Sequence, residues 1–364
     1  MRKTVMGVAA LTGVVTALAS AGAATASHAS TRTQVAKQGA PVVVVAKGFD
    51  DPFGLAKVGR HSFVVAESSA GRVTLVGPRG GHRVLVSGAP GVAGVAVRGK
   101  FVYSVLGGPN ESGSPSGGKY KPSSVLRTNL RTGKTAVIAN LLSYELAHNP
   151  DHQKQFNSKH QPYDSLSNPF SMTITPMGLL VADGGANDVL KVNPRTGRVS
   201  TFFVPPNVQH KGCVQANPGS SGCDPVPTGV TLVRGSVWVS TLGAETPGAA
   251  RVYRLSRTGH VRAVWKNFTA LTGIAVTPNR TVYLSQVTHG APEGAPPPDF
   301  NPATVGQIVR VGRHGGLSAA QVTMPVGLVI RHGHLFSTAW SVADAFLGAK
   351  GMGQIVKVNP SAFH

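Results

Sequence analysis

The sequence repeats a plan of four short apolar segments separated by tight turns. The segment NPFSMTITPMGLLVADGGANDVLKVNPRTGRVSTFFV (168–204) aligns with DPFGLAKVGRHSFVVAESSAGRVTLVGPRGGHRVLV (51–86), and further copies begin at Gly91, Val226, Leu271 and Met324. Segments this short, rich in β-branched residues and bounded by Gly, Pro and Asn, are typical of strands. Units of about 40 residues with four strands each predict an all-β fold, a six-bladed β-propeller.

The last unit predicts how the ring closes. It stops after its third strand, at Val358, whereas the segment APVVVVAKGF (40–49) precedes the first unit and has no partner of its own. A strand from the N-terminal end that completes the last blade would leave no open edge between the first and last blades. We therefore expect residues 40–364 to form a single domain, preceded by a flexible leader over residues 27–39.

The first residues indicate export from the cell. A positively charged start, MRK, is followed by an apolar run from Val5 to Ala19 and by the small-residue motif ATA at Ala24 to Ala26. This pattern predicts a signal peptide over residues 1–26 and a secreted, extracellular protein. The apolar run is shorter than the roughly 20 residues that a membrane span needs, and no later segment qualifies, so no transmembrane segment is expected.

Charge and cysteine content bear on partners and on the compartment. The chain has 35 Lys and Arg against 14 Asp and Glu, a formal net charge of +21. Outside the cell this excess favours an anionic cell-wall polymer or lipid surface as a partner and makes nucleic acid a poor candidate. The two cysteines, Cys213 and Cys223, lie in a Gly- and Pro-rich segment, and an oxidising compartment predicts a disulfide that staples this loop.

Loop length and charge both divide between the two faces of the predicted ring. Five long insertions fall between the second and third strands of a blade or between blades, which places them on one face: 107–122, 139–167, 205–224, 287–305 and 341–353. The short turns of the opposite face carry no acid and many cations: Arg60, Arg79, Arg83, Arg98, Lys100, Arg131, Lys134, Arg195, Arg198, Arg234, Arg257, Arg262, Arg280, Arg313 and Arg331. We expect the basic face to meet an anionic surface and the long loops to bind a ligand.

The candidate binding residues are the polar and aromatic side chains predicted on the long-loop face. They are Glu67, Tyr144, Glu145, Asp164, Asn168, Asp183, Glu245 and Trp340. Carboxylates could orient a polar ligand, and the aromatic rings could stack on a planar group or a sugar. A small molecule or a glycan is the class of ligand that such a face would take.

The sequence gives little sign of an enzyme. No nucleophile elbow, zinc-binding helix motif or phosphate-binding glycine loop is present, which favours a monomeric binding or scaffold module without a cofactor. The alternative is a lactonase-like hydrolase that uses a calcium-type ion at the axial mouth, with Glu67, Asn168, Asp183 and Glu245 as metal ligands. A different interpretation of these acids is structural, because Asp and Glu at strand ends accept hydrogen bonds from turn amides.

Several motifs resemble the ScyD/ScyE family of exported proteins. They are PSSVLRTNLRTGKTAVIANLLSYELAHNPD (122–151), DSLSNPFSMTITPMGLLVADGGANDVLKVNPRTGRVSTFF (164–203), PVPTGVTL (225–232) and PGAARVYRL (247–255). The resemblance covers nearly the whole chain after the leader, and departs from the family in the extra segment HQKQFNSKHQPY and an inserted Leu166-Ser167. It implies a six-bladed propeller outside the membrane and supplies no established catalytic residues.

Overall fold

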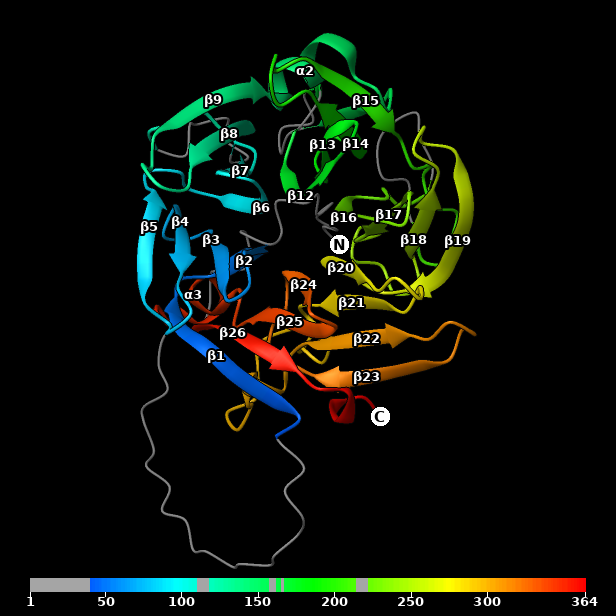
Figure 1. The fold of residues 1–364 in the computed structure, drawn as a ribbon. Coiled ribbons are helices and arrows are strands. Elements are labelled where there is room, and N and C mark those ends of the chain that lie inside the picture. Colours follow the sequence, from blue (N-terminus) through cyan, green and yellow to red (C-terminus); the bar gives the residue numbers. More distant parts are fainter. Residues whose placement is uncertain (1–39, 110–117, 157–161, 165–166, 214–221) are drawn as a thin grey trace, which may run out of the picture.

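The chain forms six four-stranded antiparallel sheets arranged in a ring in the part that the computed structural model describes (Figure 1). The described residues are 40–109, 118–156, 162–164, 167–213 and 222–364; the predicted signal peptide and leader lie outside them. The six-bladed propeller predicted from the repeat is confirmed. Strand bounds, from the inner to the outer strand, are β2 (Pro52–Val58), β3 (Ser62–Glu67), β4 (Arg72–Val76) and β5 (His82–Val86) in blade 1; β6 (Val92–Arg98), β7 (Phe101–Leu106), β8 (Ser124–Asn129) and β9 (Thr135–Asn140) in blade 2; β12 (Pro169–Thr175), β13 (Gly178–Asp183), β14 (Asp188–Val192) and β15 (Val199–Phe203) in blade 3; β16 (Pro227–Val233), β17 (Ser236–Thr241), β18 (Ala250–Leu255) and β19 (Val261–Phe268) in blade 4; β20 (Gly273–Val276), β21 (Val282–Gln286), β22 (Gln307–Val311) and β23 (Leu317–Gln321) in blade 5; and β24 (Leu328–Arg331), β25 (His334–Ala339) and β26 (Gly353–Val358) in blade 6.

Strand β1 (Val42–Phe49) completes blade 6, as the sequence predicts. It pairs antiparallel with β26, with Val42 opposite Val358 and Val44 opposite Val356, and it runs along β26 at the rim of the ring (Figure 1). The two ends of the domain are therefore hydrogen-bonded to each other. Closure of this kind removes the open edge that a ring of separate sheets would leave.

The inner strands approach one another closely because glycine occupies the axial position of most blades. A Cβ on Gly54 would lie 2.3 Å from the carbonyl oxygen of Ala93 in blade 2, and a Cβ on Gly327 would lie 2.3 Å from that of Phe53 in blade 1. Blade 3 carries Ser171 in place of the glycine. Backbone approach at this distance excludes a side chain, so these glycines serve the architecture.

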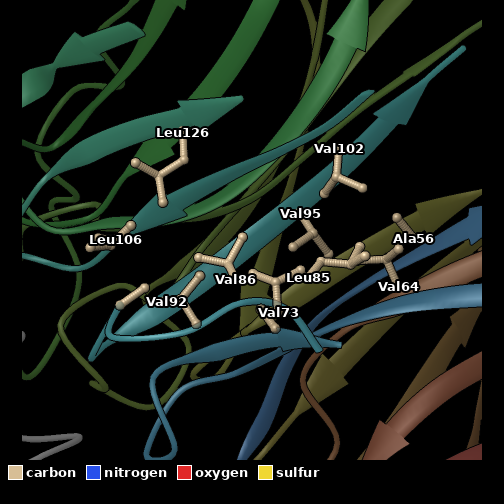
Figure 2. Packing of buried hydrophobic residues seen from close by; sticks show 12 residues of the cluster. Ala56, Val64, Val73, Leu85, Val86, Val92, Val95, Val102, Leu106 and Leu126 are labelled. Atoms are coloured by element: carbon tan, nitrogen blue, oxygen red, sulfur yellow. The ribbon is translucent and has the colours of Figure 1, made fainter. Parts of the chain in front are cut away.

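The hydrophobic core lies between neighbouring blades. In the interface of blades 1 and 2, side chains from both sheets interdigitate, among them Val64 and Val73 from blade 1 and Val95 and Leu126 from blade 2 (Figure 2). Valine and leucine at alternate positions fit two sheets that face each other, because successive side chains of a strand point to opposite faces. Similar clusters fill the other interfaces.

Several insertions contain structure that the sequence analysis treated as irregular. Helix α2 (Leu141–His148) begins directly after β9, with the Asn140 side chain accepting a hydrogen bond from the Ser143 amide as its N-cap. A small hairpin of β10 (Lys154–Phe156) and β11 (Pro162–Asp164) follows. Helix α3 (Ala343–Leu347) and the 3-10 turns η1 (Pro302–Thr304) and η2 (Pro360–Ala362) are the other helical elements of the described chain. These elements are too short for the spacing of their apolar residues to show a helical period.

The predicted disulfide is confirmed. Cys213 and Cys223 are bonded, with their Cα atoms 5.0 Å apart, in the connection between β15 and β16. An isolated bridge between Val208 and Cys223 holds the same segment. Among the described helices, none combines the length and the apolar character that crossing a membrane requires.

Candidate functional site

The strand topology places all five long insertions on one face of the ring, as the sequence predicts. They connect β7 to β8, β9 to β12, β15 to β16, β21 to β22 and β25 to β26. We call this end the long-loop face and the opposite end the short-turn face. Every acidic residue in the described part of the chain lies on the long-loop face or at a strand end that borders it. The candidate binding residues therefore share a face, but they divide into separate groups.

Glu67 belongs to an ion-pair network at the end of β3. Its side chain is fully buried and pairs with the Arg72 guanidinium, with Nη2 of Arg72 2.7 Å from Oε2 and Nε 2.8 Å from Oε1. The Thr74 hydroxyl donates a hydrogen bond to the same carboxylate, and the backbone amide of Asp50 donates another. These hydrogen bonds and the ion pair tie the start of blade 1 together. It has little capacity left for a ligand.

Asp183 fills the structural role that the sequence analysis offered as the alternative to a metal ligand. It is fully buried and accepts hydrogen bonds from the Ser167 hydroxyl, the Asn168 amide and the Ala186 amide at 2.6, 2.6 and 3.3 Å. Asn168 in turn accepts a hydrogen bond from the Gly108 amide through Oδ1. The two residues thus fix the turn after β13 and the loop after β7, which is what acids at strand ends commonly do.

Glu145 meets an acid that the sequence analysis did not single out. Asp188, at the start of β14, is fully buried beside Glu145 of α2, which is 1% exposed. Within the described chain, neither carboxylate oxygen of Asp188 has a hydrogen-bond donor, and nor does Oε1 of Glu145. Burial, the chief cause, together with nearby carboxylates including Asp183, raises the pKa of Glu145 to about 8, and burial and Glu145 raise the pKa of Asp188. The pair therefore holds a proton at neutral pH.

The stability of the protein should fall as the pH rises through the range in which this pair ionises. The pKa of Glu145 in the folded protein, about 8, exceeds its ordinary value of 4.5, so between these values the folded state binds more protons than the unfolded chain. The free energy of unfolding must then decrease with rising pH, by at most about 1.4 kcal/mol per pH unit for one group. Glu145→Gln should flatten the dependence of the urea midpoint on pH, whereas Glu293→Gln, at an exposed position, should not. Parallel curves for all three proteins would contradict the raised pKa.

The other candidates lie apart from this pair. The Tyr144 hydroxyl hydrogen-bonds to Thr201 and its ring stacks on His148, so it fastens α2 to β15. Asp164 lies in β11, opposite Lys154 in the backbone register. Glu245 is exposed in the loop between β17 and β18. Trp340 is half-buried after β25, within an apolar cluster over the axis that includes Met324 and Val342.

The axial channel does not offer the carboxylate mouth that a calcium-dependent hydrolase would need. Its volume is about 70 Å³, and its described lining is glycine and apolar or hydroxyl side chains, with Phe53 and Phe170 in contact at a centroid distance of 5.5 Å. Throughout the described residues, no three His, Cys, Asp or Glu side chains are grouped as a metal ion would require. Asn168 donates its backbone amide to Asp183, but Glu67 is bound to Arg72 and Glu245 is exposed in the loop between β17 and β18. The four weak metal candidates are therefore not grouped as ligands of one ion.

The short-turn face is strongly basic. Of the fifteen cations named above for this face, all but Arg331 are exposed, and the salt bridges of the described residues all involve Arg72 on the other face. Arg331 instead lies over the rings of Phe63 and Phe336, and burial lowers its pKa. The segregation of charge expected from the sequence is therefore present in the fold. Positive charges gathered without counter-charges attract an extended anionic surface.

No known family profile and no curated protein matches the sequence. Solved structures do resemble it. A protein of unknown function from Bacteroides thetaiotaomicron is 13% identical with a TM-score of 0.54, covering 87% of this chain and 74% of that chain. A gluconolactonase from Xanthomonas campestris is 11% identical with a TM-score of 0.51, covering 88% and 89%. A streptogramin B lyase is 12% identical with a TM-score of 0.50, covering 89% and 97%. Likeness at this level of identity shows the propeller fold alone, and the resemblance to the ScyD/ScyE family stays a prediction.

Proposed function

We propose that this protein is a secreted binding module that docks on an anionic cell-surface polymer or lipid surface through its short-turn face. The observation that carries the proposal is the separation of charge: exposed cations crowd one end of the ring, and the described acids lie at the other. Salt bridges would neutralise the positive charge of this face, but among the described residues they occur only at Arg72, on the long-loop face. A cation beside an anionic surface contributes about 1 kcal/mol to binding, so many weak contacts add up.

In this arrangement the long-loop face points away from the surface. It presents helix α2, the described parts of the long insertions and the apolar cluster around Trp340 to the surroundings. Loops on a rigid scaffold are the usual place for ligand binding in propellers and related folds. The ligand on this face is proposed to be a small molecule or a glycan. The carboxylates Glu67 and Asp183 are occupied by internal contacts, which supports binding over metal-dependent hydrolysis.

Binding to anionic vesicles should depend steeply on salt. We expect the protein to sediment with vesicles that contain phosphatidylglycerol at about 0.1 M salt and to be released at about 0.5 M, because the Debye length shortens from about 10 Å to roughly half of that. Vesicles of phosphatidylcholine alone serve as the uncharged control, and a sulfated glycan column tests an anionic polymer in the same salt series. Binding that is equal on both vesicle types, or that is unchanged by salt, would contradict the proposal.

A further inference from the structure

One position in the third strand of the blades carries a cation in five blades of the ring. These residues face the blade interfaces at the same register and are half-buried: Arg127, Lys191, Arg254, Arg310 and Lys357. Blade 1 has Leu75 at this position. Because this position is equivalent in every blade, the surroundings of the cation can be compared from blade to blade.

In four of these blades an aromatic side chain lies directly opposite the cation on the second strand. Tyr103 faces Arg127, Trp238 faces Arg254, Tyr283 faces Arg310 and Phe336 faces Lys357 in the register of the sheets. Arg254 lies over the Trp238 ring at 5.9 Å from its centroid. Arg127 and Arg310 lie instead over neighbouring rings, those of Phe101 and Phe363. Contacts between a cation and the face of an aromatic ring are stabilising.

Blade 3 breaks this pattern. Lys191 lies opposite Leu180, and β13 starts with Gly178, so no aromatic ring stands beside the lysine. A groove of about 400 Å³ is present here, lined by Met177, Lys191, Asn193, Arg198 and Ser200. The groove therefore lies in blade 3, where the cation on the third strand has no aromatic side chain opposite it.

The polar lining of the groove consists of donors without a counter-charge. Within the described chain, the side chains of Lys191 and Arg198 have no salt-bridge partner and no hydrogen-bond acceptor. Oδ1 of Asn193 accepts hydrogen bonds from the Arg195 and Thr196 amides of its own turn, which leaves its amide nitrogen as a donor. The lining contains no carboxylate, and Met177 supplies an apolar wall. Two cations, an amide nitrogen and a hydroxyl suit a phosphate or carboxylate group.

We propose that this groove in blade 3 binds a sugar or polyol unit that bears a phosphate or carboxylate group. Lys191 and Arg198 hold the anionic group, Ser200 and Asn193 donate hydrogen bonds to it, and the ring or carbon chain packs against Met177, the apolar wall of the groove. This inference rests on the proposed function, because it names one specific subsite on the face that docks on an anionic polymer.

The test is a calorimetric titration at low salt with glucose 6-phosphate and glucuronate, and with glucose as the uncharged control. We expect both anionic sugars, or one of them, to bind and glucose not to bind; the stronger ligand tells whether the subsite prefers phosphate or carboxylate. The double variant Lys191→Gln/Arg198→Gln should weaken binding about tenfold or more, because a hydrogen bond to a charged group contributes about 1.5–3 kcal/mol. Ser200→Tyr keeps both cations but fills the groove, and should weaken binding to a similar degree.

Blade 2 supplies matched controls. Arg131→Gln/Lys134→Gln removes the same charge at exposed turn residues, and Ala136→Tyr adds the same ring opposite Arg127, as Ser200→Tyr does opposite Lys191. Neither should change the affinity for the sugars. Full binding by Ser200→Tyr, equal loss in the blade 2 variants, or no binding by the parent protein would overturn the subsite. Vesicle binding is measured on the same samples: if it persists while the sugars fail to bind, the subsite fails and the docking function stands, and if it is absent too, both fail.

Discussion

Phe49→Ala should lower the free energy of unfolding by about 3–5 kcal/mol, the range for removing a buried phenylalanine side chain. Phe49 ends β1 and is fully buried. Its ring packs in a cluster with Phe63 and Val76 of blade 1 and with Phe336 and Ile355 of blade 6. The substitution therefore weakens two interfaces at once, the pairing that completes blade 6 and the contact between the last blade and the first. Urea unfolding followed by tryptophan fluorescence measures the effect.

Val44→Ala in the same strand is the matched control. Val44 pairs with Val356 through its backbone, as Phe49 does with Gly353, but its side chain is 51% exposed. Replacement there should change the free energy of unfolding by about 0.5 kcal/mol or less, since little buried area is lost. Equal effects of the two substitutions would show that β1 acts only through its backbone pairing, and would contradict a bridging role for the Phe49 ring.

Removing four cations from the short-turn face should weaken binding to anionic vesicles about 1,000-fold. The variant changes Arg60, Arg98, Arg195 and Arg257 to glutamine; all four are exposed turn or strand-end residues from four different blades. At about 1 kcal/mol for each cation near an anionic surface, the loss amounts to about 4 kcal/mol. Vesicle sedimentation at a fixed low salt concentration gives the affinity. Because the side chains are exposed, stability should stay within about 0.5 kcal/mol of the parent protein.

The control changes four lysines on the long-loop face to glutamine: Lys119, Lys121, Lys211 and Lys350, which are also exposed. Its net charge is lowered by the same amount, so the two variants differ in the face that they alter and not in total charge. We expect the control to bind vesicles nearly as well as the parent protein. If both variants lose affinity equally, net charge governs binding and the oriented docking is wrong.

Most of the fold could be predicted from local patterns. The six units, the closing strand that ends at Phe49 and the disulfide of Cys213 all follow from repeats and spacing, because each depends on residues close in sequence or on the periodic plan. Helix α2 was missed because eight residues between strands give too little periodicity to separate a helix from a loop.

The candidate site was predicted less well than the fold. The candidate residues lie on the face that the strand order predicts, but placing Glu67, Asn168, Asp183 and Glu245 together at the axial mouth required knowing which side chains turn toward the axis. Glu67 pairs with Arg72 five residues away, and Asp183 binds turn amides, whereas Glu145 meets Asp188, a residue that the pattern gave no reason to select. A signal existed in Asp188 itself, an acid that opens a largely apolar, buried strand on the long-loop side.

The sequence by itself determined the number of blades and the pairing of the first strand with the last. It also determined the division of cations and acids between two faces, because strand order alone assigns every turn to a face. The tertiary structure decided which acid forms an ion pair, which two acids are buried side by side with raised pKa values, and where a groove opens beside a cation. These depend on distances between segments that the ring brings together, such as α2 with β14 or β13 with β14. Local patterning specifies a strand and its turn, whereas burial and proximity arise only when the sheets pack.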